Sequence, residues 1–574
     1  MLKKLTPFLI VGFFVLWMAP VSINTRLPTP TGEILFYQSV VLSLLLCVSL
    51  LSVAKRLFWP FLLAIPLIGL WWPAEMFMRV QYEQPLGPNA IALLFETNRQ
   101  ELLEQIRANW ISILTGVVLS SGFLFFGAVS LYKNDARWNG YSRYLSFGVS
   151  IFLLALILCQ DIGALRAEEN FQVERSKDLG DLGFVDVIRD VYPLNVIVSI
   201  MDIWEHRRIA AQAQKSMQNF DFEATAQARS AEIVILVIGE SSKAKRWQLY
   251  GAKRETTPLL LREKNLIVLK DMIVPAVATR LSVPTIVSRN PFIKPTGQHI
   301  SSGAEPSVAK AFEQAGYSTY WWSNQAITGI YDTSTAIYAR HSQQTLWLNP
   351  VSTDISNPGK STYDAVLLPP LDRLLKEVGK KFIVMHTMGS HFDYGDRYPP
   401  EFNYFNSSVR FNGINAYGSG NKVDFQNAYD NSIRYTDWLL HQIFERLRHM
   451  SESAIVFYIS DHGEDIWDES CFQVKIDRRS AASFHVPALI WFNDAAISSF
   501  IDIYRNIRGN SNYPLTSDYI PQSIMSAAGI MVGAPSKKDV THDGISVGER
   551  MVSGFGGRLV DYDKRKVHNY CDIE

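Results

Sequence analysis

The sequence predicts two folded parts, an α-helical membrane domain followed by an α/β domain whose sheet is mostly parallel. The apolar residues of this 574-residue chain gather before about residue 165, where several runs reach the ~20 residues that a bilayer-spanning helix needs. From residue 231 onward, short β-branched runs alternate with helical patterns, which is typical of a parallel sheet covered by helices on both faces. We therefore expect a membrane domain over 1–164, a polar bridging linker over 165–230 and a globular domain over 231–574.

Five apolar runs predict five transmembrane helices, at 6–24, 34–54, 57–74, 110–132 and 145–163. The first run could instead be a signal peptide, but the MAPVS segment offers no clear small-x-small cleavage site, so we expect a retained anchor. Basic residues gather in alternate loops, at Lys3/Lys4, Lys55/Arg56 and Lys133/Arg137/Arg143. The positive-inside rule then predicts a cytoplasmic amino terminus. Five crossings place the residues after about 164 on the far side, which in a bacterium is the periplasm or the cell exterior.

Charge and cysteine usage narrow the function classes. The 55 Lys and Arg balance the 55 Asp and Glu, and no long basic block occurs, so the electrostatic footprint of a nucleic-acid binder is missing. Cys47 and Cys159 lie inside apolar runs, which leaves Cys471 and Cys571 in the soluble part. A disulfide between these two stays open, because the sequence does not show whether they approach each other.

The soluble part offers one linker helix, a set of strands and one long amphipathic helix. The linker helix is expected in NVIVSIMDIWEHRRIAAQAQKSM. Strands are expected at 233–239, 317–322, 381–387, 454–460 and 487–492. In YDNSIRYTDWLLHQIFERLRHM the apolar positions recur at helical spacing, which predicts a helix packed on the sheet through Ile433, Leu440, Ile443, Phe444 and Leu447.

Metal-type side chains follow two of the predicted strands. Glu240 follows IVILVIG, and Asp461 with His462 follows AIVFYIS. Ligands of open α/β sheets bind beyond the carboxyl ends of the strands, so these groups can converge on one ion. Carboxylate oxygen and imidazole nitrogen both bind divalent cations, and Gly463 permits a tight turn after the imidazole. The pattern predicts a metal-dependent hydrolase or transferase.

Thr279, which precedes RLSVP, is the candidate nucleophile. A threonine hydroxyl is barely nucleophilic near neutral pH, but coordination to a divalent cation stabilises its alkoxide. The segment VATRLSVPTIVSRN predicts a turn that leads into a helix, and a helix amino terminus favours an incoming phosphate. The alternative is that Thr279 merely caps this helix, and the local sequence by itself favours that alternative.

Taken together, the motifs resemble the bacterial phosphoethanolamine transferases of the alkaline-phosphatase and sulfatase superfamily. The matching runs, in chain order, are IGESSKAKRWQLYGAKRETTPLL, TRLSVP, MHTMGSHFDYGDRYP, YDNSIRYTDWLL, SDHGE and HVPALIWF. That group modifies lipid A, lipopolysaccharide core or periplasmic glucans, and its members have five spans followed by a periplasmic catalytic domain. The resemblance covers essentially the whole chain and implies an inner-membrane enzyme with a sulfatase-like catalytic domain.

The resemblance also implies a zinc site made by Glu240, Thr279, Asp461 and His462. Thr279 would double as the nucleophile that becomes covalently loaded. Relatives often carry a further histidine after the DHGE motif, whereas DIWDESCFQVKIDRR contains none. This departure puts a second metal or acceptor subsite in question.

Three further residues receive substrate-binding roles from the resemblance. Gln325 of WWSNQ matches an amide that contacts the substrate head group. His391 of HTMGSH matches a histidine placed by the substrate or a second zinc, whereas His386 is expected to be structural. His485 of SFHVPALIW either serves near the acceptor subsite or is hydrogen-bonded beneath the site.

The implied reaction moves phosphoethanolamine from phosphatidylethanolamine, through a phosphoethanolamine-threonine, to an envelope glycan or glycolipid. Lipopolysaccharide core, lipid A and a periplasmic glucan all stay open as acceptors, because catalytic motifs do not report the acceptor. One alternative is a phosphoglycerol transferase of the lipoteichoic-acid-synthase type, although the ETTP segment at 255–258 favours phosphoethanolamine. A sulfatase is disfavoured, since SVPTI lacks the final arginine of the formylglycine motif. A catalytically dead membrane scaffold should have lost a ligand, yet all four positions are present.

Overall fold

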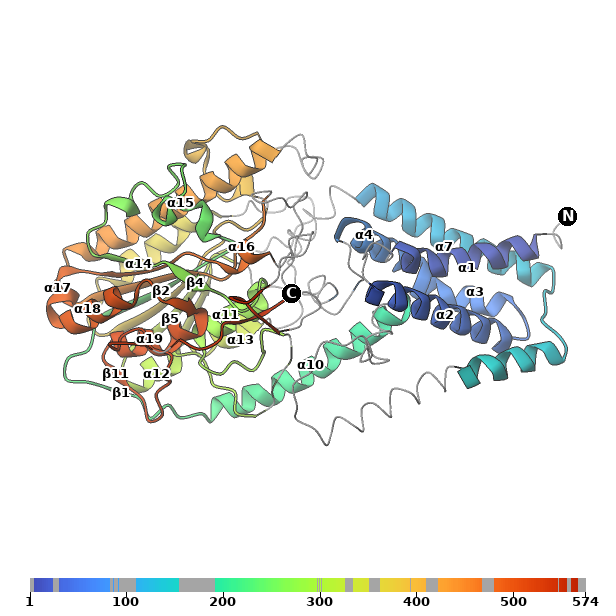
Figure 1. Cartoon of the computed structure of the whole chain (residues 1–574), viewed down its shortest axis with the longest axis horizontal. Coiled ribbons are helices and arrows are strands. Elements are labelled where there is room, and N and C mark those ends of the chain that lie inside the picture. Colours follow the sequence, from blue (N-terminus) through green and yellow to red (C-terminus); the bar gives the residue numbers. More distant parts are fainter. Residues whose placement is uncertain are drawn as a thin grey trace. The chain divides into compact units, whose positions relative to one another are not determined.

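The computed structural model divides the chain into two compact units (Figure 1). The first comprises Met1–Leu94 and Ile106–Glu205, and the second comprises Phe95–Gln105 and His206–Glu574. The structure describes residues 5–23, 30–82, 86, 91, 110–153, 191–296, 298, 300, 302–325, 334–349, 362–392, 394–408, 422–466, 480–545, 547–554 and 559–565. Each unit has its own hydrophobic core.

The first unit is helical. Its helices are α1 (Thr6–Ile23), α2 (Pro30–Val53), α3 (Phe58–Ala64), which continues as a π-helical turn over Ile65–Gly69, α4 (Trp72–Tyr82) and α7 (Trp110–Lys133). Residues 141–153 are also helical. The π-helical turn contains Pro66, which has no amide hydrogen to donate to the regular ladder. The helices pack through apolar side chains, among them the stacked rings of Phe13 and Phe61, whose centroids are 4.6 Å apart.

Helical segments overlap all five predicted apolar runs, although the run at 57–74 is divided between the helix that ends at Gly69 and α4, which begins at Trp72. Within the described residues, one helix meets the length and hydropathy expected of a span. Among the described residues, Leu114–Lys133 is long and apolar enough to cross a membrane. Thr6–Pro20, Val40–Val53 and Phe58–Gly69 are apolar but shorter. The run at 145–163 lies outside the described residues after 153. The other four spans therefore stay predictions.

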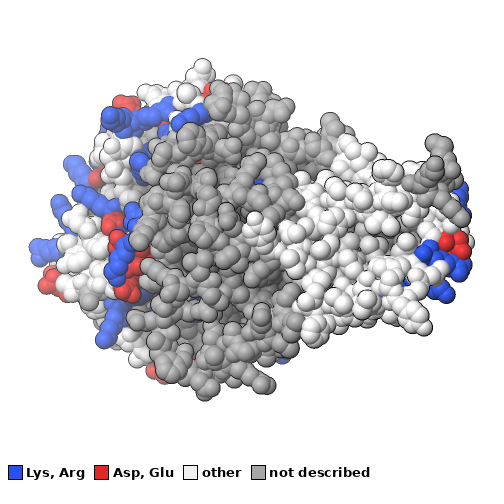
Figure 2. Space-filling model, turned by 45° about the vertical axis from the view of Figure 1, so that its right-hand side comes forward, with Lys and Arg blue, Asp and Glu red and all other residues white. Residues whose placement is uncertain are grey.

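Two of the basic loops meet at one end of this unit. Arg56 and Arg137 form an antiparallel bridge, and the Trp138 amide donates to the Lys55 carbonyl at 3.1 Å. Figure 2 shows that the visible face of this unit is almost free of charged side chains except at one end. The Lys3/Lys4 pair lies outside the described residues, and the cytoplasmic amino terminus stays a prediction.

The second unit is built on a seven-stranded sheet with the order β3-β9-β8-β2-β7-β5-β6. Its strands are β2 (Ile233–Gly239), β3 (Leu266–Leu269), β5 (Ser318–Ser323), β6 (Gln344–Trp347), β7 (Lys381–His386), β8 (Ala454–Ser460) and β9 (Ala488–Phe492). The five predicted strands are confirmed within one residue at each end, and β3 and β6 are additions at the two edges of the sheet.

The sheet is mixed, which corrects the predicted mostly parallel sheet. Strands β8, β2, β7, β5 and β6 pair in parallel, but β9 is antiparallel to both of its neighbours. Ala488 at the start of β9 pairs with Ile459 near the end of β8. Strand β9 therefore begins beside the end of β8, where the chain has just left the sheet, and so it runs antiparallel to β8.

Both faces of the sheet are covered, as the apolar runs predicted. Along β2, Ile233, Ile235 and Val237 face one hydrophobic core, while Val234, Leu236 and Ile238 face the other. Helix α15 (Lys422–Arg448) packs on the first of these faces through the five apolar positions predicted from its periodicity, all of them buried. The second core includes residues of α11 (Thr279–Val287), α12 (Ala309–Gln314) and α19 (Ile520–Ala527).

Further helices and minor strands lie outside the seven-stranded sheet. The helix α10 (Leu194–Gln218) confirms the predicted linker helix. The remaining helices are α13 (Ser334–Ala339), α14 (Leu368–Leu374), α16 (Ala481–Phe484), α17 (Asp494–Ser499) and α18 (Ile501–Asn510). The minor strands pair as β1 (Thr225–Ala226) with β11 (Ile530–Met531), β4 (Asp271–Ile273) with β10 (Pro514–Thr516), and β12 (Met551–Ser553) with β13 (Leu559–Asp561).

Candidate active site

The two ligand-bearing strands are direct neighbours in register. Gly239 at the end of β2 pairs with Ser460 at the end of β8, and the Asp461 amide donates to the Gly239 carbonyl at 3.0 Å. Glu240 and Asp461 are the next residues of their strands. The sheet ladder itself therefore brings these two carboxylates together, as expected for the carboxyl edge of a parallel pair.

A strained turn at Ser241 holds both carboxylates. Ser241 has φ +54°, a left-handed conformation that costs an ordinary residue about 1–2 kcal/mol. Its amide donates to Asp461 Oδ1 at 3.0 Å, and its hydroxyl donates to Glu240 Oε1 at 2.8 Å. The Tyr429 hydroxyl of α15 donates to the Ser241 carbonyl at 2.6 Å. These contacts fix a backbone conformation that Ser241 would not adopt by itself.

Four side-chain atoms that could bind a metal ion gather at this turn. His462 Nε2 lies 3.4 Å from Glu240 Oε1 and 3.6 Å from Asp461 Oδ2. Thr279 Oγ1 lies 3.3 Å from Glu240 Oε1 and 3.2 Å from Glu240 Oε2. A tetrahedral zinc with ligand distances of about 2.0–2.1 Å spaces its ligands about 3.3–3.4 Å apart, so the donor spacing fits such an ion.

Two features of the ligand residues also fit a bound cation. Asp461 Oδ2 is buried and accepts no hydrogen bond from the described residues. His462 Nδ1 lies 3.0 Å from the Gly463 carbonyl, and in the tautomer that donates this bond the Nε2 lone pair points toward the carboxylates. Glu240, Asp461 and His462 can thus hold one metal ion, with Thr279 beside them.

The charges at this cluster are strongly perturbed. Burial raises the pKa of Asp461 to about 8, and the nearby Glu240 charge adds to that increase. Burial also acts to raise the pKa of Glu240, but the hydrogen bond and charge of His462 outweigh it, so this pKa falls below its ordinary value. Burial lowers the pKa of His462, yet the Asp461 charge and the Glu240 hydrogen bond raise it to about 10. Two buried carboxylates in contact favour a positive ion between them.

Thr279 is not the cap of its helix, so the capping alternative is wrong. The N-cap of α11 is Ala278, which has an extended backbone, and Thr279 is the first helical residue. Its hydroxyl donates to Glu240 instead. In the first turn of the same helix, the Ser282 hydroxyl donates to the Asp461 carbonyl, which ties this helix terminus to the end of β8.

Gln325 joins the cluster from the end of β5. Its Nε2 donates to Glu240 Oε2 at 2.8 Å and to the Thr387 carbonyl at 3.0 Å. The amide thereby orients the second oxygen of the Glu240 carboxylate, as the outer hydrogen-bond partners of metal sites commonly do for a ligand. Its expected contact with the substrate head group stays a prediction.

His391 lies on a loop that packs directly on Glu240. The Ser390 amide donates to the Glu240 carbonyl at 2.9 Å, and Gly389 has φ +47°. A Cβ at Gly389 would lie 2.8 Å from both the backbone nitrogen and the backbone oxygen of Glu240, so only glycine fits. His391 Nδ1 lies 2.6 Å from the Phe392 carbonyl. His386 is buried at the end of β7, with its Nδ1 3.2 Å from the Ser323 hydroxyl, as expected of a structural histidine.

Asp364 is a buried carboxylate that the sequence did not reveal. Its Oδ1 accepts from the Met388 amide and from Asn324 Nδ2, both at 2.8 Å. Its Oδ2 accepts from the Gly389 amide at 2.9 Å. One side chain therefore clamps the loops that carry Gln325 and His391. A single aspartate in the polar run STYD gives no signal of this role.

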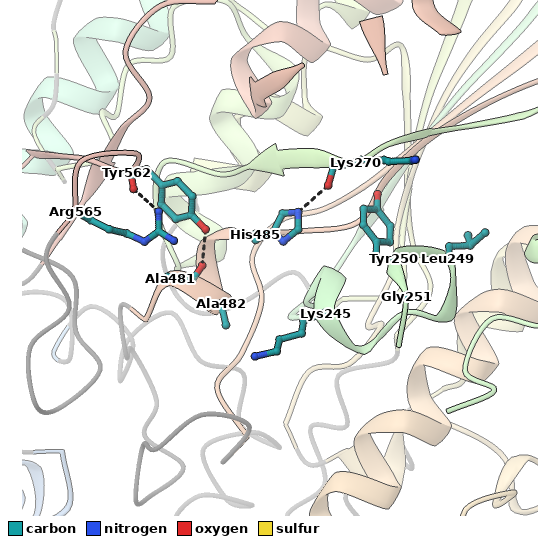
Figure 3. Close-up of a pocket in the computed structure, with 10 residues that line it drawn as sticks. All are labelled: Lys245, Leu249, Tyr250, Gly251, Lys270, Ala481, Ala482, His485, Tyr562 and Arg565. Carbon is teal, nitrogen blue, oxygen red and sulfur yellow. Dashed lines mark hydrogen bonds between the residues drawn. The ribbon is translucent and has the colours of Figure 1, made fainter. Parts of the chain in front are cut away.

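His485 is not among the clustered ligand atoms. Its Nε2 lies 3.0 Å from the Lys270 carbonyl, and its ring meets the edge of Tyr250 with centroids 6.0 Å apart. It lines a separate pocket, drawn in Figure 3. The segment after DHGE, including Cys471, and the residues Cys159 and Cys571 lie outside the described part of the chain, so the disulfide stays untested.

Comparison with known proteins finds a family model and sequence relatives that match this chain. The sulfatase family model matches residues 232–530. A Kdo(2)-lipid A phosphoethanolamine 7''-transferase of Salmonella typhimurium is 29% identical over 269 residues, which cover 46% of this chain and 45% of that protein. The enzyme of the same name from Escherichia coli K12 is 24% identical over 412 residues, or 68% of this chain and 70% of that protein. The chain thus matches about half of the length of the Salmonella relative.

Solved structures share the fold. The integral membrane protein lipooligosaccharide phosphoethanolamine transferase A of Neisseria meningitidis aligns with a TM-score of 0.65 at 19% identity, over 93% of this chain and 97% of that chain. The zinc complex of the C-terminal periplasmic domain of Escherichia coli EptC aligns with a TM-score of 0.52 at 22% identity, over 59% of this chain and 95% of that chain. The first match covers both units of this chain.

The matched residues 232–530 begin just before β2 and include all four clustered side chains. They make up more than half of the chain. This protein belongs to the sulfatase family and, within it, is similar to the phosphoethanolamine transferases of the bacterial envelope.

Proposed function

We propose that this protein is a zinc-dependent phosphoethanolamine transferase of the bacterial inner membrane. It takes phosphoethanolamine from phosphatidylethanolamine and passes it to an envelope glycan or glycolipid. The observation that carries the proposal is the Thr279 hydroxyl, which lies 3.2 Å from a Glu240 oxygen and beside the buried Asp461 and the partly buried His462. A hydroxyl aimed at a set of metal ligands is the arrangement of an activated nucleophile.

In the first half-reaction Thr279 Oγ forms a bond to the donor phosphorus, and the bond from phosphorus to the diacylglycerol oxygen breaks. In the second, an acceptor oxygen attacks the same phosphorus and releases the threonine. Zinc held by Glu240, Thr279, Asp461 and His462 would supply positive charge for the threonine oxygen and for the phosphoryl oxygens. His391, on the loop packed against Glu240, is our candidate for protonating the leaving diacylglycerol oxygen.

The helical first unit suits a lipid donor. The reactive phosphate of phosphatidylethanolamine lies at the lipid–water interface, and an anchored catalytic unit stays near that interface. We extend the proposal to the topology predicted above, with the amino terminus in the cytoplasm and residues 231–574 in the periplasm. Cysteine labelling with a membrane-impermeant reagent tests this topology. A cysteine introduced at Lys376, which is exposed in the second unit, should react in cells whose outer membrane has been permeabilised. Protection of that cysteine until the inner membrane is broken would overturn the topology.

Intact-protein mass spectrometry tests the reaction. Wild type, Thr279→Ala and Thr279→Ser are incubated with zinc and phosphatidylethanolamine in the absence of any acceptor. We expect a mass increase of one phosphoethanolamine on wild type, a smaller fraction loaded on the serine variant, which keeps the hydroxyl, and none on the alanine variant. No increase on wild type would sink the proposal. An increase of one phosphoglycerol with phosphatidylglycerol would instead identify a phosphoglycerol transferase.

A further inference from the structure

Four consecutive polar residues of α15 are buried, and the proposed reaction gives none of them a role. They are Tyr429, Asp430, Asn431 and Ser432, in the long helix labelled α15 in Figure 1. Successive residues of an α-helix point about 100° apart, so four of them point to most sides of the helix. This turn is therefore enclosed by protein instead of showing one face to water. Burying polar groups is costly unless they are hydrogen-bonded, so the contacts of these side chains show what the turn does.

Two of the four residues fasten nearby loops to α15. Asp430 forms an ion pair with Arg246, with 3.1 Å between Oδ2 and the guanidinium nitrogen. Asn431 Nδ2 donates to the Phe405 carbonyl at 2.8 Å. Each contact joins the helix to a segment distant in sequence, so this turn of α15 is fixed in place from more than one side.

The Tyr429 hydroxyl bridges two backbone groups in the turn that follows Glu240. It donates to the Ser241 carbonyl at 2.6 Å and accepts from the Lys243 amide at 3.0 Å. Between these two contacts Ser241 has φ +54°, and in this conformation its amide reaches Asp461 Oδ1 while its hydroxyl reaches Glu240 Oε1. One phenol hydroxyl thus supports the turn that orients both candidate metal-binding carboxylates.

Ser432 contacts the second segment that packs on Glu240. Its Oγ lies 2.8 Å from Ser390 Oγ, and the Ser390 amide donates to the Glu240 carbonyl at 2.9 Å. The Ser432 hydroxyl also lies 2.7 Å from the Tyr429 carbonyl, three residues earlier in the helix. The same turn of α15 therefore supports two backbone segments at Glu240, and Tyr429 contacts the one with the strained conformation.

We infer that Tyr429 is a positioning residue of the metal centre. Its hydroxyl keeps the Ser241 turn left-handed, and Ser241 in turn orients one oxygen of each carboxylate. That orientation leaves Asp461 Oδ2, which is buried and accepts no hydrogen bond from the described residues, available to the ion. The inference rests on the proposed function, because it assigns Tyr429 to the zinc site that the transfer reaction would use.

The variant Tyr429→Phe, made in the full chain and purified in detergent, tests this inference. Phenylalanine keeps the ring and removes only the hydroxyl, so the Ser241 turn loses its support and can relax from the left-handed region. We expect the zinc dissociation constant, measured by competition with a chelator of known affinity, to rise about 10- to 100-fold, as is usual when an outer partner of a metal site is removed. With zinc saturating, loading of Thr279 should slow about tenfold, while the half-saturating concentration of phosphatidylethanolamine stays the same, because the hydroxyl faces backbone groups.

Tyr317→Phe is the matched control. Tyr317 is buried, and its hydroxyl donates to the Ala231 carbonyl at 2.5 Å, just before β2 and at the end of that strand opposite Glu240. The control should lose stability to a similar extent, as measured by thermal unfolding in EDTA, but keep its zinc affinity within about twofold of wild type. Equal zinc affinity of the two phenylalanine variants would overturn the inference. A higher half-saturating donor concentration at an unchanged maximal rate would place the hydroxyl at the donor and would also overturn it.

A glycine at position 241 shows whether Tyr429 acts through the turn. Glycine takes a positive φ without strain, so in the Ser241→Gly background the turn needs less support from outside. Adding Tyr429→Phe to Ser241→Gly should therefore weaken zinc binding only about twofold. An equal loss in both backgrounds would mean that Tyr429 does not act through Ser241. This comparison of the double variant with Ser241→Gly stays informative if Tyr429→Phe fails to fold by itself, and a tenfold loss there would again contradict the inference.

Zinc affinity is measured without any substrate, which separates this inference from the proposed function. Loading of wild type, combined with wild-type zinc affinity in Tyr429→Phe, would refute the positioning role alone. A tenfold loss of zinc affinity in Tyr429→Phe without any loading of wild type would refute the transferase reaction and leave Tyr429 as a positioning residue of the metal site.

Discussion

Replacement of Asp364 by asparagine should weaken zinc binding without unfolding the protein. The two oxygens of Asp364 accept three buried N–H groups, from Met388, Gly389 and Asn324. An asparagine keeps one acceptor oxygen for two of these donors and turns its own amide toward the third, at Gly389. One buried N–H group thereby loses its partner, at a cost of about 1–3 kcal/mol.

The lost hydrogen bond should lower zinc affinity, because Gly389 and its neighbour Ser390 pack on the backbone of Glu240. If the loop shifts to relieve the lost hydrogen bond, Glu240 shifts with it. Converted at 1.4 kcal/mol per tenfold, the lost hydrogen bond corresponds to zinc affinity weakened by roughly 5- to 140-fold. The zinc dissociation constant is measured by competition with a chelator of known affinity at pH 8, and stability is measured separately by thermal unfolding in excess EDTA.

Asp437→Asn is the matched control. Asp437 is a buried carboxylate of α15 that accepts the backbone amides of Leu259 at 3.0 Å and Leu260 at 2.9 Å. The isosteric change should lower stability there to a similar extent but leave zinc affinity within about twofold of wild type, since neither amide touches a ligand residue. The reasoning is refuted if both variants lose similar stability and both retain wild-type zinc affinity.

Three further results are expected. Gly389→Ala should reduce transfer activity by about 100-fold or more, because the new Cβ would meet the Glu240 backbone at 2.8 Å; Gly379→Ala, at φ +109° in open space, should cost only stability. Zinc at 1,000 times its dissociation constant should raise the free energy of unfolding by about 4 kcal/mol relative to the EDTA-treated protein, as followed by thermal denaturation. Acid should destabilise the second unit through His341, whose Nδ1 accepts the Ser307 amide at 3.1 Å and whose pKa burial lowers to about 4. Since the unfolded chain takes up this proton near pH 6.5, stability falls by about 2–3 kcal/mol between pH 7.5 and 4.5, as measured by urea unfolding.

Each of these results can fail in its own way. Equal activity of the two alanine variants would mean that the contact between Gly389 and Glu240 is not required for catalysis. If zinc does not shift the unfolding curve, the folded protein does not bind zinc. The variant His341→Gln, which can still accept the Ser307 amide, should flatten the pH dependence, and an unchanged slope would assign the acid sensitivity to other groups.

The candidate ligand residues could be found in the sequence because they follow strands that are easy to recognise. Runs such as IVILVIG and AIVFYIS are apolar on both faces, so their ends could be placed and Glu240 and Asp461 found there. The role of Thr279 could not be decided locally, because threonine is favoured at the N-cap and the sequence does not fix the first residue of a helix to within one position. Only the fold places its hydroxyl against Glu240, a residue 39 positions away in sequence.

Other features leave no local signature. The direction of β9 depends on whether the chain re-enters the sheet at the carboxyl or the amino ends of the parallel strands. An alternation of strands and helices in the sequence does not reveal that direction. Edge strands β3 and β6 have only four residues each, too few for a period to be recognised. The clamp by Asp364 depends on three donors from two other loops, so its importance is visible only once those loops are in place.

The register between β2 and β8 has a consequence for how this protein can diverge. Because Gly239 faces Ser460, the distance between the following carboxylates is set by the spacing of adjacent strands, about 4.7–4.9 Å. Exchange of one apolar side chain for another leaves this spacing between the two strands unchanged. Deletion of one residue within either strand would slide its carboxylate by about 3.3 Å and turn it to the opposite face. Homologous proteins that keep this site should therefore show many substitutions in these two strands but almost no insertions or deletions.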